Sequence, residues 1–171
     1  MRRRGGVLPN SVEIGAAFDV LAACRRAKLK VATAESCTGG LVAAALTEIP
    51  GSSDVVERGF VTYSNEAKEQ MLAVSPALIR AFGAVSEPVA RAMADGALNR
   101  SHADLTVAIT GVAGPGGGTV EKPVGLVHFG VARRGRATQA SYRIFGGDRA
   151  AVRRQAVEYA LNLLLDAAIK P

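Results

Sequence analysis

The sequence is poor in aromatic residues, histidines and cysteines. It has no tryptophan, only 5 % aromatic residues, and two histidines and two cysteines among its 171 residues. The core must therefore be built mainly from Ala, Val, Leu and Ile. Two cysteines without CxxC spacing form no disulfide framework, and neither His102 nor His128 lies near a cysteine or a pair of carboxylates. The sequence predicts no metal site and no cofactor.

Long apolar runs are also missing. No stretch reaches the roughly 18 apolar residues of a membrane-spanning helix, which argues against a membrane partner. The basic N-terminus, MRRRGGVLPNS, is not followed by an apolar segment with a small-residue cleavage site. We therefore expect a cytoplasmic protein, with residues 1–10 as a flexible basic arm and residues 11–171 as one domain.

The positive charge is modest once the N-terminus is set aside. The formal net charge is +6, and Arg2, Arg3 and Arg4 supply three of these charges. Nucleic-acid binding usually needs a basic stripe on one face, so the remaining charge and the scarcity of aromatics argue against that partner. The charge is equally compatible with an acidic small molecule. The sequence leaves open whether the chain forms a homo-oligomer.

Hydrophobic patterns predict strands that alternate with helices. The first helix is expected from Ser11, which would cap it, to about residue 28. Alternation of this kind favours a three-layer α/β/α fold with a mixed, mainly parallel sheet that ends in an antiparallel hairpin. The expected strands are 29–34, 55–63, 104–110, 124–133 and 139–145, and further helices are expected at 39–49 and from residues 64, 86 and 147.

Three polar clusters follow predicted strands, at residues 35–38, 63–65 and 110–111. Ligands of open α/β sheets bind beyond the carboxyl ends of the strands, so the fold should gather these clusters into one site. Ser36 precedes two glycines, which is typical of a helix cap and also of a nucleophile on a strand-to-helix turn. Cys37 can be simply a small buried side chain, and Lys68 a solvated lysine.

The glycine-rich segment 111–123 (GVAGPGGGTVEKP) does not match a known phosphate motif. Gly111 and Gly116 have the spacing of a Walker loop, but Gly117 stands where that loop needs lysine. Thr119 occupies the third glycine position of the dinucleotide pattern. The segment could bind an anion through its backbone N–H groups, or be a surface loop, and the residues do not decide between these readings.

Several blocks together resemble the CinA C-terminal domain family. They are TAESCTGGLVAAALTEIPGSSDVVERGFVTYSNEAK, GAVSEPVA, AITGVAGPGGGTVEKPVGLVHFGVA and FGGDRAAVRRQAVEYAL. The match runs from about Ser11 to Leu165, and the AESCTGG, YSNEAK and TGVAGPGGG blocks are highly specific in combination. Larger members carry an additional N-terminal domain, so this chain resembles the stand-alone form.

The resemblance implies a nicotinamide-nucleotide amidohydrolase. Such an enzyme hydrolyses the carboxamide of nicotinamide mononucleotide (NMN), releasing nicotinic acid mononucleotide and ammonia, in pyridine-nucleotide recycling. The resemblance implies Ser36 as the nucleophile, Lys68 as the base and Tyr63 as a third catalytic residue. It also implies Thr110 and Arg149 as further site residues, and we predict that Cys37, Thr38, Gly39, Thr110, Gly111 and Arg149 bind the substrate.

A serine–lysine mechanism makes definite physical demands. Lys68 must be neutral to act as a base, and lowering its pKa from about 10.4 to 7–8 costs roughly 3–4 kcal/mol. Burial or a cation such as Arg149 could supply this shift. Backbone N–H groups after Ser36, at the start of the next helix, are expected to stabilise the oxyanion. Tyr63 could relay a proton or orient Lys68, and Arg149 or the 111–122 loop could bind the phosphate.

Two alternatives belong to other classes of protein. One is a non-catalytic nucleotide-binding or competence/DNA-damage-related module, against which the intact pair Ser36 and Lys68 argues. The other is a DNA-binding protein, suggested by the pI of 9.8 and the N-terminal arginines. A steep salt dependence of DNA binding would distinguish it from an enzyme.

Overall fold

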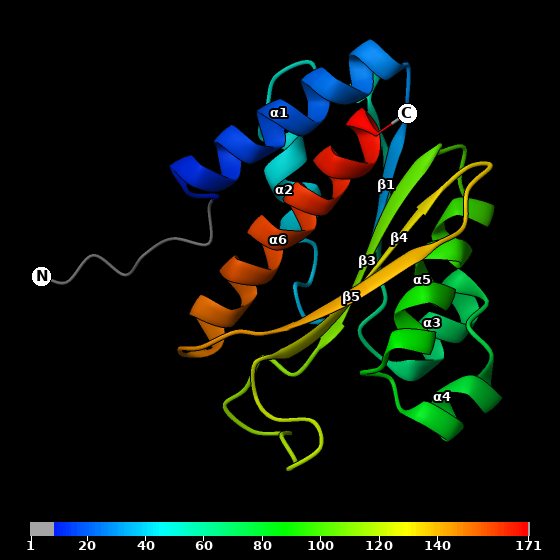
Figure 1. Ribbon diagram of the computed structural model, residues 1–171, viewed down its shortest axis with the longest axis vertical. Helices are drawn as coiled ribbons and strands as arrows, with labels where there is room; N and C mark the ends of the chain where they lie inside the picture. Colours follow the sequence, from blue (N-terminus) through cyan, green and yellow to red (C-terminus); the bar gives the residue numbers. More distant parts are fainter. Residues whose placement is uncertain (1–8, 171) are drawn as a thin grey trace, which may run out of the picture.

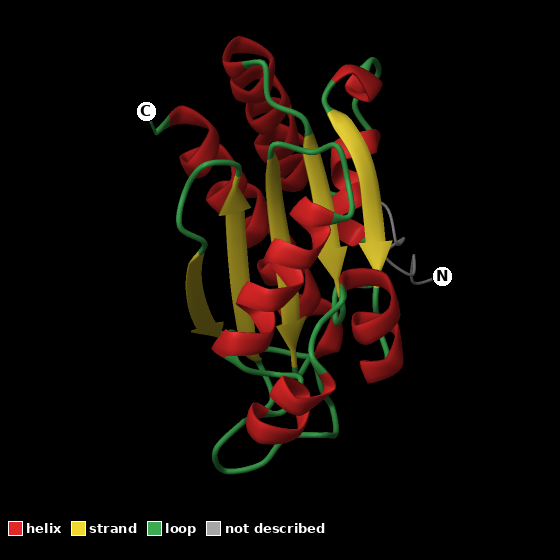
Figure 2. Cartoon of the chain, turned by 90° about the vertical axis from the view of Figure 1, so that its right-hand side faces the viewer, coloured by secondary structure: helices red, strands yellow, loops and turns green. Residues whose placement is uncertain are grey.

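Five strands form one mixed sheet in the computed structural model, which describes residues 9–170. The sheet order is β2-β1-β3-β4-β5, and Figure 1 labels β1, β3, β4 and β5. β1 pairs in parallel with β2 and β3, whereas β4 pairs antiparallel with β3 and β5, so β4 runs against the other strands (Figure 2). The strands are β1 (Val31–Glu35), β2 (Val56–Val61), β3 (Leu105–Gly111), β4 (Leu126–Arg133) and β5 (Gln139–Ile144).

Helices cover both faces of the sheet, which confirms the predicted three-layer α/β/α fold (Figure 1). One face carries α1 (Ser11–Ala27), α2 (Leu41–Thr47) and α6 (Arg149–Ile169). The other carries α3 (Asn65–Leu72), α4 (Pro76–Phe82) and α5 (Glu87–Asn99), of which α4 was not predicted. A 3-10 turn, η1 (Ser52–Asp54), precedes β2. No helix within residues 9–170 combines the length and apolarity that crossing a membrane requires.

The central strands are buried because helices pack on both of their faces. All of β1 and nearly all of β3 are buried, whereas the edge strands β2 and β5 are largely exposed. This difference follows from the apolar runs of the central strands, which suit a sheet covered on both sides. Small residues allow close approach: a Cβ at Gly96 of α5 would lie 2.0 Å from the Leu72 carbonyl oxygen of α3.

The cap of α1 and the start of α2 differ from the sequence prediction, and α6 begins at Arg149 rather than at residue 147. The cap of α1 is Asn10 rather than Ser11, because the Asn10 side chain accepts from the Val12 and Glu13 amides while Glu13 bonds back to the Asn10 amide. α2 begins at Leu41 rather than at residue 39. Gly39 (φ +60°) and Gly40 (φ +100°) adopt left-handed conformations that delay the helix. The predicted arm lies mainly in residues 1–8, outside the described residues.

Candidate active site

A pocket of about 310 Å³ lies where β1, β2 and β3 end at the same edge of the sheet. All three predicted polar clusters contribute to its wall, together with the start of α6 and most of residues 111–117. Seven of the nine predicted site residues line the pocket. They are Ser36, Cys37, Tyr63, Lys68, Thr110, Gly111 and Arg149.

Thr38 and Gly39, the other two predicted residues, lie beside the pocket rather than in its wall. The Thr38 side chain is fully buried, and its hydroxyl has no hydrogen-bond partner among the described residues. Any contact that Thr38 makes with a ligand must therefore come from its backbone. Gly39 is exposed and serves the left-handed turn before α2.

Backbone pairing brings Ser36 and Lys68 together. The Ser36 amide donates to the Ile109 carbonyl (2.9 Å), and the Thr62 amide donates to the Glu35 carbonyl (2.8 Å). These bonds continue the sheet just beyond its strands and place the start of α3 beside the turn after β1. Ser64 then caps α3 by accepting from the Ala67 amide at 3.0 Å.

Lys68 is the largest fully buried side chain of the described residues, and its side chain ends at the serine. Its Nζ lies 3.1 Å from Ser36 Oγ, 2.8 Å from the Thr62 carbonyl oxygen and 3.3 Å from the Tyr63 carbonyl oxygen. No carboxylate within residues 9–170 forms an ion pair with it. Burial lowers the pKa of Lys68 below its ordinary value, since the charged form loses water without gaining a counter-ion.

Ser36 does not cap the following helix. The cap position of α2 is Gly40, which has no side chain, and the acceptor for the first amides is Glu35. Glu35 is fully buried; its Oε2 accepts from the Gly40 and Val42 amides (3.0 and 3.1 Å), and its Oε1 accepts from the Ala43 amide at 2.9 Å. An acidic residue is favourable at a helix N-terminus, so its place just before a predicted helix could have indicated this role for Glu35. The sequence prediction did not single out Glu35.

The amides of residues 36–43 can therefore be accounted for one by one. Glu35 takes three of them, and backbone carbonyls accept from those of Ser36, Gly39 and Leu41. The amides of Cys37 and Thr38 have no acceptor within residues 9–170. Since buried amides are nearly always hydrogen-bonded, these two are the N–H groups of the turn that remain for a ligand.

Arg149 and Tyr63 form one rim of the pocket. Arg149 donates to the Tyr63 hydroxyl at 3.1 Å and to the Gly114 carbonyl at 2.9 Å, which ties α6 to the glycine-rich loop. Tyr63 is 61 % exposed. Tyr63 contacts Lys68 through its carbonyl oxygen, and no hydrogen bond joins its hydroxyl to Lys68 in the described structure. Of the two roles predicted for Tyr63, orientation of Lys68 has a contact in the structure, and this contact is made by the backbone.

Thr110 and Cys37 also line the pocket, but their side chains have few hydrogen-bonding groups that are free for a ligand. The Thr110 hydroxyl donates to the Ala84 carbonyl at 2.8 Å. Burial raises the pKa of the Cys37 thiol to about 11, so it is a neutral group beside the serine at physiological pH. No cluster of three or more His, Cys, Asp or Glu side chains suited to a metal ion occurs within residues 9–170.

A second arginine, Arg153, reaches the same turn and was not predicted. It lies one helical turn after Arg149 on α6. Its Nε donates to the Cys37 carbonyl and its terminal nitrogen to the Thr38 carbonyl, both at 3.1 Å. Local sequence patterns could not predict this contact, because Arg153 and the turn are separated by more than 110 residues in the sequence.

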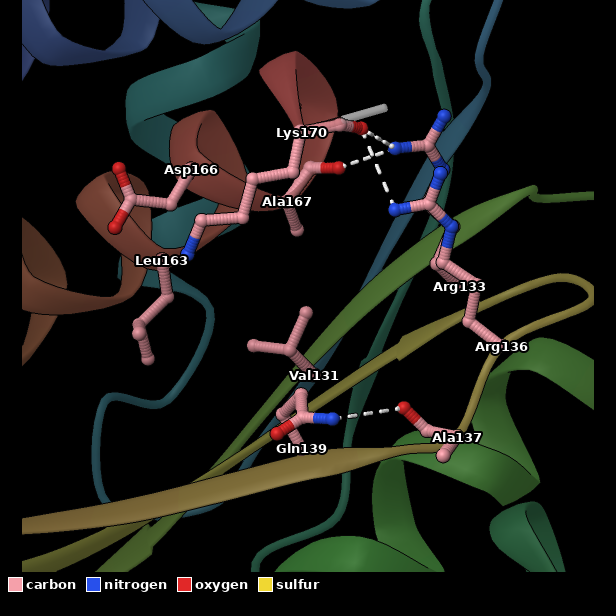
Figure 3. Close-up of a pocket in the computed structure, with 9 residues that line it drawn as sticks. All are labelled: Val131, Arg133, Arg136, Ala137, Gln139, Leu163, Asp166, Ala167 and Lys170. Atoms are coloured by element: carbon pink, nitrogen blue, oxygen red, sulfur yellow. Dashed lines mark hydrogen bonds between the residues drawn. The ribbon is translucent and has the colours of Figure 1, made fainter.

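Another pocket, of about 320 Å³, lies between β4, β5 and the end of α6 (Figure 3). It contains none of the predicted site residues. Its arginines bind the last turn of α6: Arg133 donates to the Ala167 and Lys170 carbonyls, and Arg136 donates to Lys170. Cations are favourable at a helix C-terminus, so helix capping accounts for these two side chains.

Comparison with known proteins identifies relatives over nearly the whole chain. A CinA-like protein from Akkermansia muciniphila is 50 % identical over 155 residues, covering 90 % of this chain and 37 % of that protein. A CinA-like protein from Mycobacterium tuberculosis is 54 % identical over 153 residues, covering 89 % of this chain and 35 % of that protein. The chain thus spans about a third of the length of these curated relatives.

Solved structures show the same fold over nearly their full length. The competence/damage inducible protein CihA from Agrobacterium tumefaciens superposes with a TM-score of 0.90 at 48 % identity, covering 95 % of this chain and 98 % of its own. A CinA superfamily protein from Klebsiella pneumoniae gives 0.87 at 36 % identity, covering 91 % and 97 %. The family model of the CinA C-terminal domain matches residues 15–168. The chain therefore belongs to the CinA C-terminal domain family.

Proposed function

We propose that this chain hydrolyses the carboxamide of NMN to nicotinic acid mononucleotide and ammonia, with Ser36 as the nucleophile and Lys68 as its base. The observation that carries the proposal is the 3.1 Å contact between Lys68 Nζ and Ser36 Oγ in a buried position at a pocket. A hydroxyl beside a desolvated amine is the arrangement that serine–lysine catalysis requires.

The contacts of Lys68 suit a neutral amine. Such an amine has two N–H bonds and one lone pair. The Thr62 and Tyr63 carbonyls, at 2.8 and 3.3 Å, can accept the two N–H bonds, and a third carbonyl, that of Ser64, lies farther away at 3.5 Å. The lone pair then faces the hydroxyl of Ser36. Carbonyl oxygens also stabilise the protonated amine, which raises its pKa. Burial must therefore lower the pKa of Lys68 by more than these carbonyls raise it. The positive pyridinium ring of NMN favours the neutral form further, because like charges repel.

The reaction then follows in two stages. Lys68 accepts the hydroxyl proton while Ser36 Oγ forms a bond to the carboxamide carbon, and the carbonyl oxygen becomes an oxyanion. When the C–N bond breaks, the protonated Lys68 gives its proton to the leaving ammonia, and an ester on Ser36 remains. Lys68 next accepts a proton from water, whose oxygen attacks the ester, and the proton returns to Ser36 as the carboxylic acid departs.

The oxyanion needs donors that are already in place. The free amides of Cys37 and Thr38 follow the nucleophile directly and suit this role. These are N–H groups after Ser36, as predicted, but they belong to the turn, because Glu35 already occupies the amides of Gly40, Val42 and Ala43 at the start of α2. The oxyanion site is therefore the turn itself rather than the helix that follows it.

The pocket rim suits the phosphate of the nucleotide. A guanidinium has five N–H donors, and Arg149 commits its two bonds to the Tyr63 hydroxyl and the Gly114 carbonyl. Its remaining donors, with exposed amides of the loop at Gly116 and Gly117, can meet a phosphate. We assign the phosphate contact to this rim and the carboxamide to the buried end at Ser36.

The direct test is ammonia release from NMN by purified protein, with nicotinamide riboside and free nicotinamide as substrates that lack the phosphate. We expect release from NMN and a higher KM for the two smaller compounds. Binding of NMN without ammonia release would instead support the non-catalytic nucleotide-binding alternative. Absence of both binding and release would remove NMN from consideration.

A further inference from the structure

Arg153 binds the back of the turn that carries the nucleophile. The side chain is partly buried, and its two hydrogen bonds end on consecutive carbonyls, those of Cys37 and Thr38. Neither carbonyl belongs to a residue of a helix or strand. Arg153 therefore binds a short irregular segment in which the backbone groups do not all form hydrogen bonds with one another.

Because the peptide bond is planar, these hydrogen bonds also fix the direction of an N–H group on the pocket side of the turn. The Cys37 carbonyl and the Thr38 amide belong to the same planar trans peptide, in which C=O and N–H point in opposite directions. Holding the oxygen toward Arg153 thus directs the Thr38 N–H away from Arg153. A cation on the oxygen also polarises the N–H at the other end of the unit, which makes it a better donor.

The preceding peptide is held in the same way by the backbone. The Ser36 carbonyl accepts from the Gly39 amide at 3.0 Å, and it shares its peptide unit with the free Cys37 N–H. Both peptides therefore have a fixed oxygen and a free N–H. The difference is that the first is held by a turn hydrogen bond, whereas the second depends on a side chain from α6.

The turn needs such support because its sequence is flexible. Gly39 and Gly40 both adopt positive φ, and glycine loses more conformational freedom on folding than other residues. Glu35 holds the far end of the turn through the amides of Gly40, Val42 and Ala43. The Thr38 hydroxyl has no hydrogen-bond partner within residues 9–170 and therefore does not hold the turn.

We propose that Arg153 is a positioning residue for catalysis, which holds the Cys37–Thr38 peptide so that its N–H points at the oxyanion. The inference rests on the proposed acyl-transfer function of Ser36. It does not place Arg153 in contact with the carboxamide, because Arg153 lines a neighbouring pocket that shares Arg149, and not the pocket that contains Ser36.

The test compares Arg153→Met and Arg153→Lys with the control Arg154→Met. Arg154 is the exposed neighbour of Arg153 on α6 and makes no side-chain hydrogen bond within residues 9–170. Two rates are measured: kcat for ammonia release, and sulfonylation of Ser36 by phenylmethylsulfonyl fluoride, followed by mass spectrometry. The second rate needs the serine, its base and the oxyanion site, but not NMN.

Because loss of one oxyanion donor costs about 100- to 1,000-fold in rate, loosening one should lower both rates about tenfold or more in Arg153→Met. KM should change less than about threefold, because the substrate pocket is intact. Arg153→Lys keeps the charge but not the forked donor and should fall between the wild type and Arg153→Met. Arg154→Met should remain within about twofold of the wild type.

The midpoint of the pH–rate profile separates positioning from electrostatics. If Arg153 acted by repelling a proton from Lys68, its removal would shift the midpoint upward; under our proposal the midpoint stays and the plateau falls. Circular dichroism and urea unfolding establish that the variants fold. Should Arg153→Met not fold, Arg153→Lys decides, and wild-type rates in that variant would overturn the proposal.

The outcomes keep the two proposals apart. Normal sulfonylation of the wild type with no release from NMN would refute the substrate and leave the role of Arg153 to be read from the sulfonylation rates. Normal release from NMN with unchanged rates in Arg153→Met would refute the positioning role alone. A wild type that neither reacts with the sulfonyl fluoride nor releases ammonia would count against both.

Discussion

Replacing Lys68 with arginine is the sharpest test of the mechanism. Arginine keeps a positive charge and most of the length, but its guanidinium stays protonated at any usable pH and cannot act as a base. The site is demanding, because Lys68 is 1 % exposed and its amine lies within 3.3 Å of Ser36 Oγ and of the Thr62 and Tyr63 carbonyl oxygens. We therefore expect Lys68→Arg to be almost inactive.

The expected size of the loss follows from two effects. General-base catalysis contributes about 100- to 10,000-fold in rate, which corresponds to about 2.7–5.5 kcal/mol of barrier. The larger guanidinium must also fit among the groups that surround the buried amine, and overpacking of this kind costs about 1–3 kcal/mol of stability. A folded Lys68→Arg variant should thus retain no more than about one hundredth of the wild-type kcat for NMN.

The assay is ammonia release from NMN between pH 6 and 9, beside the control Lys30→Arg. Lys30 is exposed and precedes β1, at the opposite end of the strand from Ser36, so its replacement should leave the rate unchanged. The wild-type rate should rise with pH, because burial places the pKa of Lys68 below its ordinary value and the neutral form is the active one. A flat wild-type profile, or more than about a tenth of the wild-type rate in Lys68→Arg, would refute Lys68 as the base; a tenth is only about 1.4 kcal/mol.

The same shift has a consequence for stability with a defined sign. Since the pKa of Lys68 is lower in the folded state, the native protein binds fewer protons than the unfolded chain at pH values between the folded and unfolded pKa. The contribution of Lys68 to the free energy of unfolding therefore decreases as the pH falls through the pKa of this lysine in the unfolded chain. It stops decreasing below the pKa of Lys68 in the folded protein. Urea unfolding of the wild type and Lys68→Met should show the gap between them widening toward lower pH, in favour of the variant.

Four further changes test the rest of the site. Ser36→Ala should abolish ammonia release while circular dichroism shows an intact fold, and a comparable rate would mean that another residue is the nucleophile. Cys37→Ser should keep substantial activity, and the wild-type thiol, with its pKa raised to about 11, should react slowly with iodoacetamide at pH 8. Thr38→Val should stay within about twofold of the wild-type rate and should not be less stable, because the buried hydroxyl it removes has no partner. Exhaustive chelation should leave the rate unchanged, and restoration of a lost rate by one added divalent ion would contradict the prediction of a metal-free site.

The architecture was predictable from local patterns. Alternating strand and helix signals led to the α/β/α layers, and the apolar run before Glu35 led to a buried central strand. The short helix α4 was missed, since its seven residues carry too few periodic positions. The first cap was misplaced by one residue because Asn10 and Ser11 are both good capping residues, and only the reciprocal bond with Glu13 distinguishes them.

The neighbourhood of the site also followed from the sequence. Parallel strands end at a common edge, so clusters at the ends of β1, β2 and β3 had to meet, and the resemblance to the CinA family attached roles to Ser36 and Lys68. By itself, then, the sequence determined the layers, the edge that carries the site and most of the side chains that line it.

Only the tertiary structure decided what each group is free to do. Whether Lys68 is solvated or desolvated depends on the turn after β1 and on the segment 62–64, which surround its amine. Whether the helix amides are available depends on Glu35, whose carboxylate accepts from three of them. The hydrogen bond from Arg153 to the Cys37 carbonyl joins positions that are separated by more than 110 residues. Burial and hydrogen-bond saturation are properties of distant segments packed together, so no periodicity or motif spacing within one segment can reveal them.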